Sequence, residues 1–199
     1  MKIITKILAL AIGAVALFSV SAQAATFNVN LDDPLVLGTL AADDTTGNVL
    51  ENVSGSVNGL RRSPWDTTSN KDATYTSIGA NSTAGYNFSS LVSGISFLWG
   101  SIDHWNKITF LNDGKVVDTL FGDDVYNNSI AIPARGYANI DIIAAASFNR
   151  VVFESTPYNA FEFANLQVSA VPLPAALPLY GAGVAVLGFM GWRRRRNAA

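Results

Sequence analysis

Residues 108–120 read ITFLNDGKVVDTL, two short apolar runs on either side of Asn112-Asp113-Gly114. Asparagine, aspartate and glycine tolerate the positive φ angles that a tight hairpin turn requires. In the first run Ile108 and Phe110 flank Thr109, the period of two that is typical of a half-buried strand. We therefore expect an antiparallel hairpin with strands at 108–111 and 115–120.

The same alternation recurs on both sides of this hairpin. Phe27, Val29 and Leu31 alternate with asparagines, and Phe161 and Phe163 flank Glu162. Residues 140–146 fit a short helix or a buried strand, and their β-branched isoleucines favour the strand. Breaks are expected at Asp32-Asp33-Pro34, Asp43-Asp44, Ser63-Pro64, Gly122-Asp123-Asp124 and Thr156-Pro157. Strands spaced about eight to twelve residues apart predict an all-β fold, an antiparallel β-sandwich or jelly-roll-like domain.

Charge divides the chain of 199 residues into three parts. Six of the 13 basic residues lie at the two ends, namely Lys2, Lys6, Arg193, Arg194, Arg195 and Arg196. Residues 25–170 therefore hold 7 basic and all 15 acidic residues, a net charge of −8. An acidic body without a basic cluster excludes a nucleic-acid partner. The chain has no cysteine, which excludes disulfides, thiolate nucleophiles and cysteine metal sites. A stretch of this length fits one domain.

The N-terminal residues 1–24 have the layout of a secretory signal peptide. Two lysines precede an apolar run from Ile7 to Val20, and the small-residue pattern Ala22-Gln23-Ala24 follows. A short apolar helix with these flanks is threaded through the translocon and cut by signal peptidase. We expect cleavage between Ala24 and Ala25. An uncleaved membrane anchor is the alternative interpretation.

The C-terminal residues 171–199 predict a membrane-inserted tail. Pro172 and Pro174 end any preceding strand, and residues 175–192 are 18 residues without a charge. A transmembrane helix of that length spans about 27 Å, enough for a thin bilayer. The membrane stop is expected at the basic cluster of Arg193, Arg194, Arg195 and Arg196. This cluster stays cytoplasmic under the positive-inside rule, so the exported body lies on the outer side. The alternative is a buried core helix, but an apolar surface on all sides argues against it.

The order of Pro-containing motif, apolar helix and arginine cluster resembles the PEP-CTERM sorting signal. Val171-Pro172-Leu173-Pro174-Ala175 matches its VPLPA variety, with Leu173 where the commoner form has glutamate. The resemblance covers about 25 residues. It implies processing by an exosortase, a membrane-embedded transpeptidase of Gram-negative bacteria. The precursor would be anchored in the inner membrane, and the product would pass to the cell surface or extracellular matrix.

Several short phrases of the body are also similar to a family of exosortase-dependent surface proteins with β-sandwich bodies. The phrases are Gly55-Ser56-Val57, Arg62-Ser63-Pro64-Trp65, Leu98-Trp99-Gly100-Ser101 followed by Asn106, and Phe161-Glu162-Phe163-Ala164-Asn165. The resemblance supports the expected fold and implies no reaction.

Three kinds of site are candidates in the body. Trp65, Trp99 and Trp105 are candidate sugar-stacking aromatics, and extracellular polysaccharide is the corresponding partner, although core packing is the usual fate of such residues. Asp103-His104 suggests a hydrolase, as do the potential carboxylate partners Glu51, Glu154 and Glu162, but no G-x-S-x-G motif is present. Asp43-Asp44, Asp113 and Asp123-Asp124 are oxygen ligands suited to Ca²⁺, and no EF-hand spacing accompanies them.

These observations predict an exported, single-domain β-protein without catalytic activity, metal or other cofactor. Its role is expected to be structural or adhesive at the cell surface or in the matrix. A carbohydrate-binding module with the same sorting tail is the second hypothesis, and a secreted hydrolase is the third.

Overall fold

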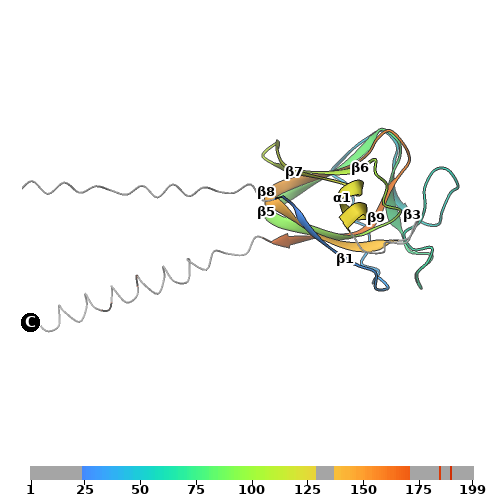
Figure 1. Ribbon diagram of the computed structural model, residues 1–199, viewed down its shortest axis with the longest axis horizontal. Coiled ribbons are helices and arrows are strands. Elements are labelled where there is room, and N and C mark those ends of the chain that lie inside the picture. The colour runs from blue at the N-terminus through green and yellow to red at the C-terminus, as the bar shows by residue number, and fades with distance from the viewer. Residues whose placement is uncertain (1–23, 129–136, 171–183, 185–188, 190–199) are drawn as a thin grey trace, which may run out of the picture.

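The structure is a computed structural model that describes residues 24–128 and 137–170, together with residues 184 and 189. The described part is predominantly antiparallel β-sheet, as expected, with a single α-helix (Figure 1). In chain order the elements are β1 (Thr26–Asn30), β2 (Asp44–Thr46), β3 (Val49–Val53), β4 (Tyr75–Ile78), β5 (Ser82–Trp99), β6 (Asn106–Asn112), β7 (Lys115–Phe121), α1 (Gly122–Asn128), β8 (Ala138–Ser155) and β9 (Phe161–Ala170).

The hairpin at 108–120 forms as expected. β6 and β7 pair antiparallel, with Asn112 opposite Lys115 and Ile108 opposite Leu120. Asp113 has a φ of 48° and Gly114 a φ of 78°, so both turn residues adopt the left-handed region. Two consecutive positive φ angles are those of a type I′ turn, whose twist matches that of the flanking strands.

Two long strands, β5 and β8, form the centre of the sheet. Each has 18 residues, and they pair from Ser82 opposite Ser155 to Trp99 opposite Ala138. The register shifts between Asn87 and Val92, where β5 becomes exposed. Such bulges bend a strand and increase its twist. The expected spacing of short strands missed this length, because a bend interrupts the apolar alternation without ending the strand.

Beyond the central pair, different neighbours join the two halves of β5 and β8. The first half of β5 pairs with β2, and the second half pairs with β9. The last part of β8 pairs with β6, and its first part pairs with β1. The order along the main path of the sheet is β3-β4-β9-β5-β8-β6-β7.

The core consists largely of aromatic rings from β5, β8 and β9. Phe153 of β8 stacks on Phe163 of β9, with ring centroids 4.4 Å apart and planes at 12°. Trp99 stacks on Phe161 at 4.5 Å and 4°. Phe97 contacts Phe153 edge to face at 5.4 Å. All of these rings are at most 3% exposed. Phe153 and Phe163 lie on strands that are not sheet neighbours, so their stacking connects β8 to β9 across β5.

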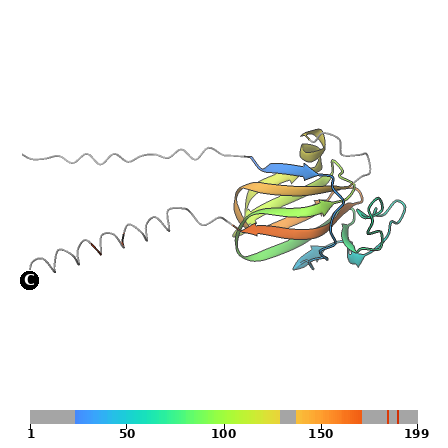
Figure 2. The same cartoon turned by 90° about the horizontal axis from the view of Figure 1, so that it is seen from below.

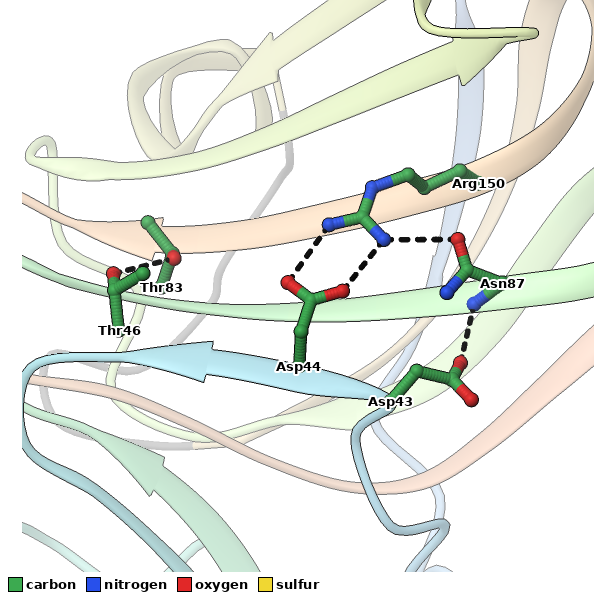
Figure 3. A network of polar contacts seen from close by, with 6 residues as sticks. All are labelled: Asp43, Asp44, Thr46, Thr83, Asn87 and Arg150. Atoms are coloured by element: carbon green, nitrogen blue, oxygen red, sulfur yellow. Dashed lines mark hydrogen bonds and ion pairs between the residues drawn. The ribbon is translucent and has the colours of Figure 1, made fainter.

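Arg150 of β8 attaches the short strand β2 to this frame (Figure 3). Its guanidinium donates to both carboxylate oxygens of Asp44, at 2.7 and 2.9 Å, and to Asn87 Oδ1 at 2.8 Å. The backbone N–H of Asn87 donates to Asp43 at 2.6 Å. The Arg150 guanidinium holds the pKa of the Asp44 carboxyl below its ordinary value. A bidentate pair of this kind fixes geometry as well as charge, so Arg150 reinforces the pairing of β2 with β5.

The start of β1 and the end of β9 lie at the same end of the sheet, measured along the strands. Thr26 of β1 is opposite Ile143 of β8, Ile143 is opposite Gly94 of β5, and Gly94 is opposite Ser169 of β9. Thr26 and Ser169 therefore share one transverse row, about 14 Å apart at the usual strand spacing. Figure 2 shows β1 beginning and β9 ending at the same end of the body, and the segment after β3 at the other end.

The structure can be compared with three further predictions about local secondary structure. Strand β7 ends at Phe121, at the expected break. Residues 122–128 then form helix α1, which was not predicted, with Asp123 and Asp124 in its first turn, where acidic side chains favour a helix N-terminus. Residues 140–146 belong to β8, as expected. Strand β2 begins at Asp44, within the expected Asp43-Asp44 break.

Most of the predicted N-terminal signal peptide and C-terminal sorting tail lies outside the described residues. These parts are the signal segment up to residue 23, the motif Val171–Ala175, the transmembrane segment 175–192 apart from two of its residues, and the membrane-stop arginines Arg193, Arg194, Arg195 and Arg196. The expectations for them therefore stay predictions. In the part that is described, no helix combines the length and the apolar character needed to cross a bilayer.

We predict that Phe153→Ala lowers the free energy of unfolding by about 3–5 kcal/mol, because it removes a ring packed between the two halves of the sheet. Phe121→Ala is the matched control, since Phe121 of β7 is 46% exposed and its loss should cost less than about 1 kcal/mol. Denaturant unfolding of both variants measures the difference. Equal destabilisation would contradict this account of the core.

Candidate functional site

A surface cavity of about 700 Å³ lies between segment 56–66 and the start of β9. It is at the end of β9 opposite Ala170, roughly 20 Å from the end of the sheet where β1 begins and β9 ends, at the usual rise per strand residue. Three segments contribute most of its wall: the one that follows β3, the one between β5 and β6, and the one that leads into β9. The lining residues are Ser56, Val57, Asn58, Gly59, Leu60, Arg61, Arg62, Asp66, Ser101, Asp103, Asn159, Ala160 and Glu162.

Glu162 is the most deeply buried charged group in this wall, at 1% exposure. It lies between Phe161 and Phe163 on β9, so its side chain is on the face opposite the aromatic core. Segment 56–66 covers that face, and the backbone N–H of Arg62 donates to Glu162 Oε1 at 2.7 Å. Ser101 Oγ donates to Oε2 at 3.0 Å. Burial raises the pKa of Glu162 to about 7, and these hydrogen bonds only partly oppose the effect.

Asp103 lines the same cavity from the segment between β5 and β6. Burial raises the pKa of its carboxyl to about 6, and His104 beside it acts in the opposite direction. The backbone N–H of Asp103 donates to Asn106 Oδ1 at 3.1 Å, and Asn106 Nδ2 donates to the carbonyl of Ala160 at 3.2 Å. Buried Asn106 thus joins the two segments that carry Asp103 and the lining residue Ala160.

An aromatic cluster is formed by residues that are close in sequence to the cavity lining. Trp105 contacts the ring of Tyr158 at 5.3 Å and the imidazole of His104 at 4.5 Å. Tyr158 is 61% exposed and precedes Asn159 in the wall, while His104 and Trp105 follow Asp103. Accessible rings beside a polar cavity are suited to an amphipathic ligand.

Two of the three candidate sugar-stacking tryptophans are core residues. Trp65 and Trp99 are both 0% exposed. Their indole N–H groups are hydrogen-bonded inside the protein, to the Thr74 carbonyl at 3.1 Å and to Asn106 Oδ1 at 3.3 Å. Neither ring is available to a ligand. Trp105 is the one of the three that is partly exposed and lies near the cavity.

The other carboxylates proposed as partners of Glu162 lie elsewhere. Glu51 accepts a hydrogen bond from the backbone N–H of Ala42 at 2.6 Å, and Glu154 pairs with Lys107 at 2.5 Å. Neither lines the cavity, so Asp66 and Asp103 are the carboxyls that accompany Glu162 there. Within the described ranges His104 is exposed and has no hydrogen bond to a serine or carboxylate that would form a triad.

The aspartates suggested as Ca²⁺ ligands are separated in the fold. Asp44 pairs with Arg150, Asp113 accepts from Asn149 at 2.8 Å, and Asp123 is in helix α1. Among residues 24–128 and 137–170, no three carboxylate, imidazole or thiolate groups are close enough together to hold a metal ion. The candidate ligands therefore do not assemble a Ca²⁺ site there.

The short motifs singled out in the body sequence converge at this cavity. Ser56, Arg62, Ser101 and Glu162 come from four different motifs. The hydroxyl of Ser56 accepts from the N–H of Ser63 at 2.8 Å and donates to Asp66. These motifs are visible in the sequence, but their positions do not reveal a common site. The segments are up to about a hundred residues apart, and they meet only when β9 pairs with β4 and β5.

Comparison with known proteins does not assign the chain to a family. No family model matches it, and no curated protein matches it. One solved structure that matches is that of the CBM51-2 and INT domains from Clostridium perfringens ZmpB, at 15% sequence identity and a TM-score of 0.34. The match covers 64% of this chain and 30% of that chain. At this TM-score we draw no conclusion on fold or function from the likeness.

The raised pKa of Glu162 predicts that stability falls as pH rises. The folded protein retains a proton up to about pH 7 that the unfolded chain releases near its ordinary value of 4.5. The stabilisation is complete below the unfolded pKa and is lost as the pH rises through the folded one, at up to about 1.4 kcal/mol per pH unit. Asp103, with a folded pKa of about 6, contributes with the same sign.

We expect Glu162→Gln to flatten the decline in unfolding free energy between pH 4.5 and about pH 7, because the amide stays neutral. Glu154→Gln is the control, since Glu154 pairs with Lys107 outside the cavity. Denaturant titrations at several pH values give the slopes. A Glu162→Gln slope as steep as that of the unchanged protein would contradict the assignment.

Proposed function

We propose that the protein is an exported surface or matrix component with a non-catalytic β-sandwich body. In this proposal residues 1–24 are removed by signal peptidase, and an exosortase of a Gram-negative bacterium processes the tail at Val171–Ala175. Until then the precursor is held in the inner membrane by the helix at 175–192 and by Arg193, Arg194, Arg195 and Arg196. The body works after release, in a structural or adhesive role.

The arrangement of the body's two ends carries this proposal. Thr26 and Ser169 lie in one row across β1, β8, β5 and β9. After cleavage at residue 24, the body can be attached through its C-terminal side at this end without strain on the fold. The cavity is lined by residues at the start of β9, at the end of that strand opposite Ala170. This geometry suits a domain that presents a binding surface outward from a membrane or matrix.

A non-catalytic role is favoured by the way the cavity carboxyl is used. Both oxygens of Glu162 accept hydrogen bonds, from the Arg62 backbone and from the Ser101 hydroxyl. Its interactions fasten segment 56–66 to β9. A general acid or nucleophile needs an oxygen directed at substrate, and those of Glu162 are engaged within the protein.

Binding of extracellular saccharide is the second candidate function. The observation in its favour is the pair formed by Trp105 and Tyr158 beside the cavity, with Tyr158 largely exposed. The cavity volume of about 700 Å³ lies in the range of small-molecule sites.

Mass spectrometry of the exported protein tests the sorting proposal. We expect a mature N-terminus at Ala25 and loss of Arg193, Arg194, Arg195 and Arg196, because both signals are cut during export. Deletion of the exosortase from the producing cell should leave the arginines in place. Surface protein with an intact C-terminus in cells that have the enzyme would overturn the proposal.

Replacement of all four tail arginines by glutamine should impair both retention and processing, since the cytoplasmic charge orients the apolar segment. Cell fractionation should show most of the variant unprocessed. Arg61→Gln with Arg62→Gln is the control, because it removes arginines from the body and should be sorted normally. Unchanged processing of the tail variant would show that the arginines do not direct it.

A further inference from the structure

Some basic residues of the described body form ion pairs and others do not. Lys107 pairs with Glu154 and Arg150 pairs with Asp44. The adjacent Arg61 and Arg62 form no ion pair with any residue in the described ranges, yet both line the cavity. In a body with a net charge of −8, two arginines free of carboxylate partners therefore meet at one site.

The carboxyls in the same wall do not neutralise these arginines. Glu162 is held by the backbone N–H of Arg62 rather than by its guanidinium, and by Ser101. Asp66 accepts from the hydroxyl of Ser56. The Nε–H of Arg61 is buried without a hydrogen-bond partner. Burial also favours the neutral form of Asp103 and Glu162, which lowers the negative charge that faces Arg61, Arg62, Asp66 and His104.

An anion supplied by a ligand would satisfy this arrangement. A guanidinium presents parallel N–H donors that match the two oxygens of a carboxylate or the oxygens of a sulfate. Other polar groups of the wall, such as Ser101 and Asn159, are suited to hydroxyls. Trp105 and Tyr158 at the margin provide ring faces and edges for the apolar side of a sugar.

We propose that this cavity binds an acidic saccharide, with the sugar's oxyanion on Arg61 and Arg62 and its ring against Trp105 and Tyr158. This inference rests on the second candidate function and specifies its ligand. The acidic body repels a polyanion from the rest of the surface, so the arginine pair provides selectivity as well as attraction.

Binding is measured with the full-length chain in detergent against three polymers. Polygalacturonate carries carboxylates, dextran sulfate carries sulfates, and dextran is neutral. We expect binding to one or both polyanions that weakens with added salt, and none to dextran. The polymer that binds distinguishes carboxylate from sulfate as the preferred anion.

Three variants locate the site. Arg61→Gln and Arg62→Gln should each weaken polyanion binding about tenfold, the loss expected for a charge-assisted contact. Lys71→Gln removes the same charge from an exposed position outside the cavity and should change binding less than about twofold. Arg62 contacts Glu162 through its backbone, so Arg62→Gln leaves that hydrogen bond in place and keeps the test valid if Arg61→Gln fails to fold.

Each contrary result has a separate meaning. Equal binding of dextran would overturn the acidic ligand class and leave saccharide binding standing. Polyanion binding unchanged in both arginine variants would overturn the site. Competition by inorganic sulfate at the same concentration of anionic groups would show a general anion site and overturn the saccharide assignment. Binding to none of the polymers would overturn the inference and the second candidate function, whereas the sorting proposal is decided independently by the mature termini.

Discussion

The pairing of β5 with β8 is the constraint on which the other elements depend. β1, β2, β6 and β9 hydrogen-bond directly to one of these strands, and β4, β3 and β7 follow from them. The approach is close at Gly94, where an added Cβ would lie 2.3 Å from the Ile142 carbonyl oxygen. A side chain there would force the strands apart, so glycine is needed at the point where the row from Thr26 to Ser169 crosses β5.

The alternation of β9 connects this frame to the cavity. Phe161 and Phe163 are directed into the aromatic core, and Glu162 is directed to the other face. A buried carboxyl on that face requires hydrogen-bond donors, and segment 56–66 and Ser101 supply them. The same contacts that satisfy Glu162 hold Arg61 and Arg62 at the cavity wall. The two faces of β9 therefore contribute to different features: one packs in the core, and the other helps to form the cavity wall.

Sequence patterns predicted local structure best where one chemical rule operates within a few residues. The turn at Asp113-Gly114, the strand at Phe161–Ala170 and the strand character of residues 140–146 all follow from turn chemistry or side-chain period. The sequence patterns gave a wrong prediction, or none, where contacts between distant residues determine the structure. Helix α1 was not predicted. Trp65 and Trp99 proved to be core residues, because exposure of an aromatic ring depends on what packs over it.

The sequence alone determined the all-β class and the acidic body, and it predicts a sorting signal at each end, because composition, period and charge order are properties of the chain itself. Only the tertiary structure decided that Glu162 is accompanied by Asp66 and Asp103 and not by Glu51 or Glu154, and that Arg61 and Arg62 face a cavity. It also placed the two ends of the body at one end of the sheet. These relations join residues up to about 140 positions apart, and strand pairing alone brings such residues together.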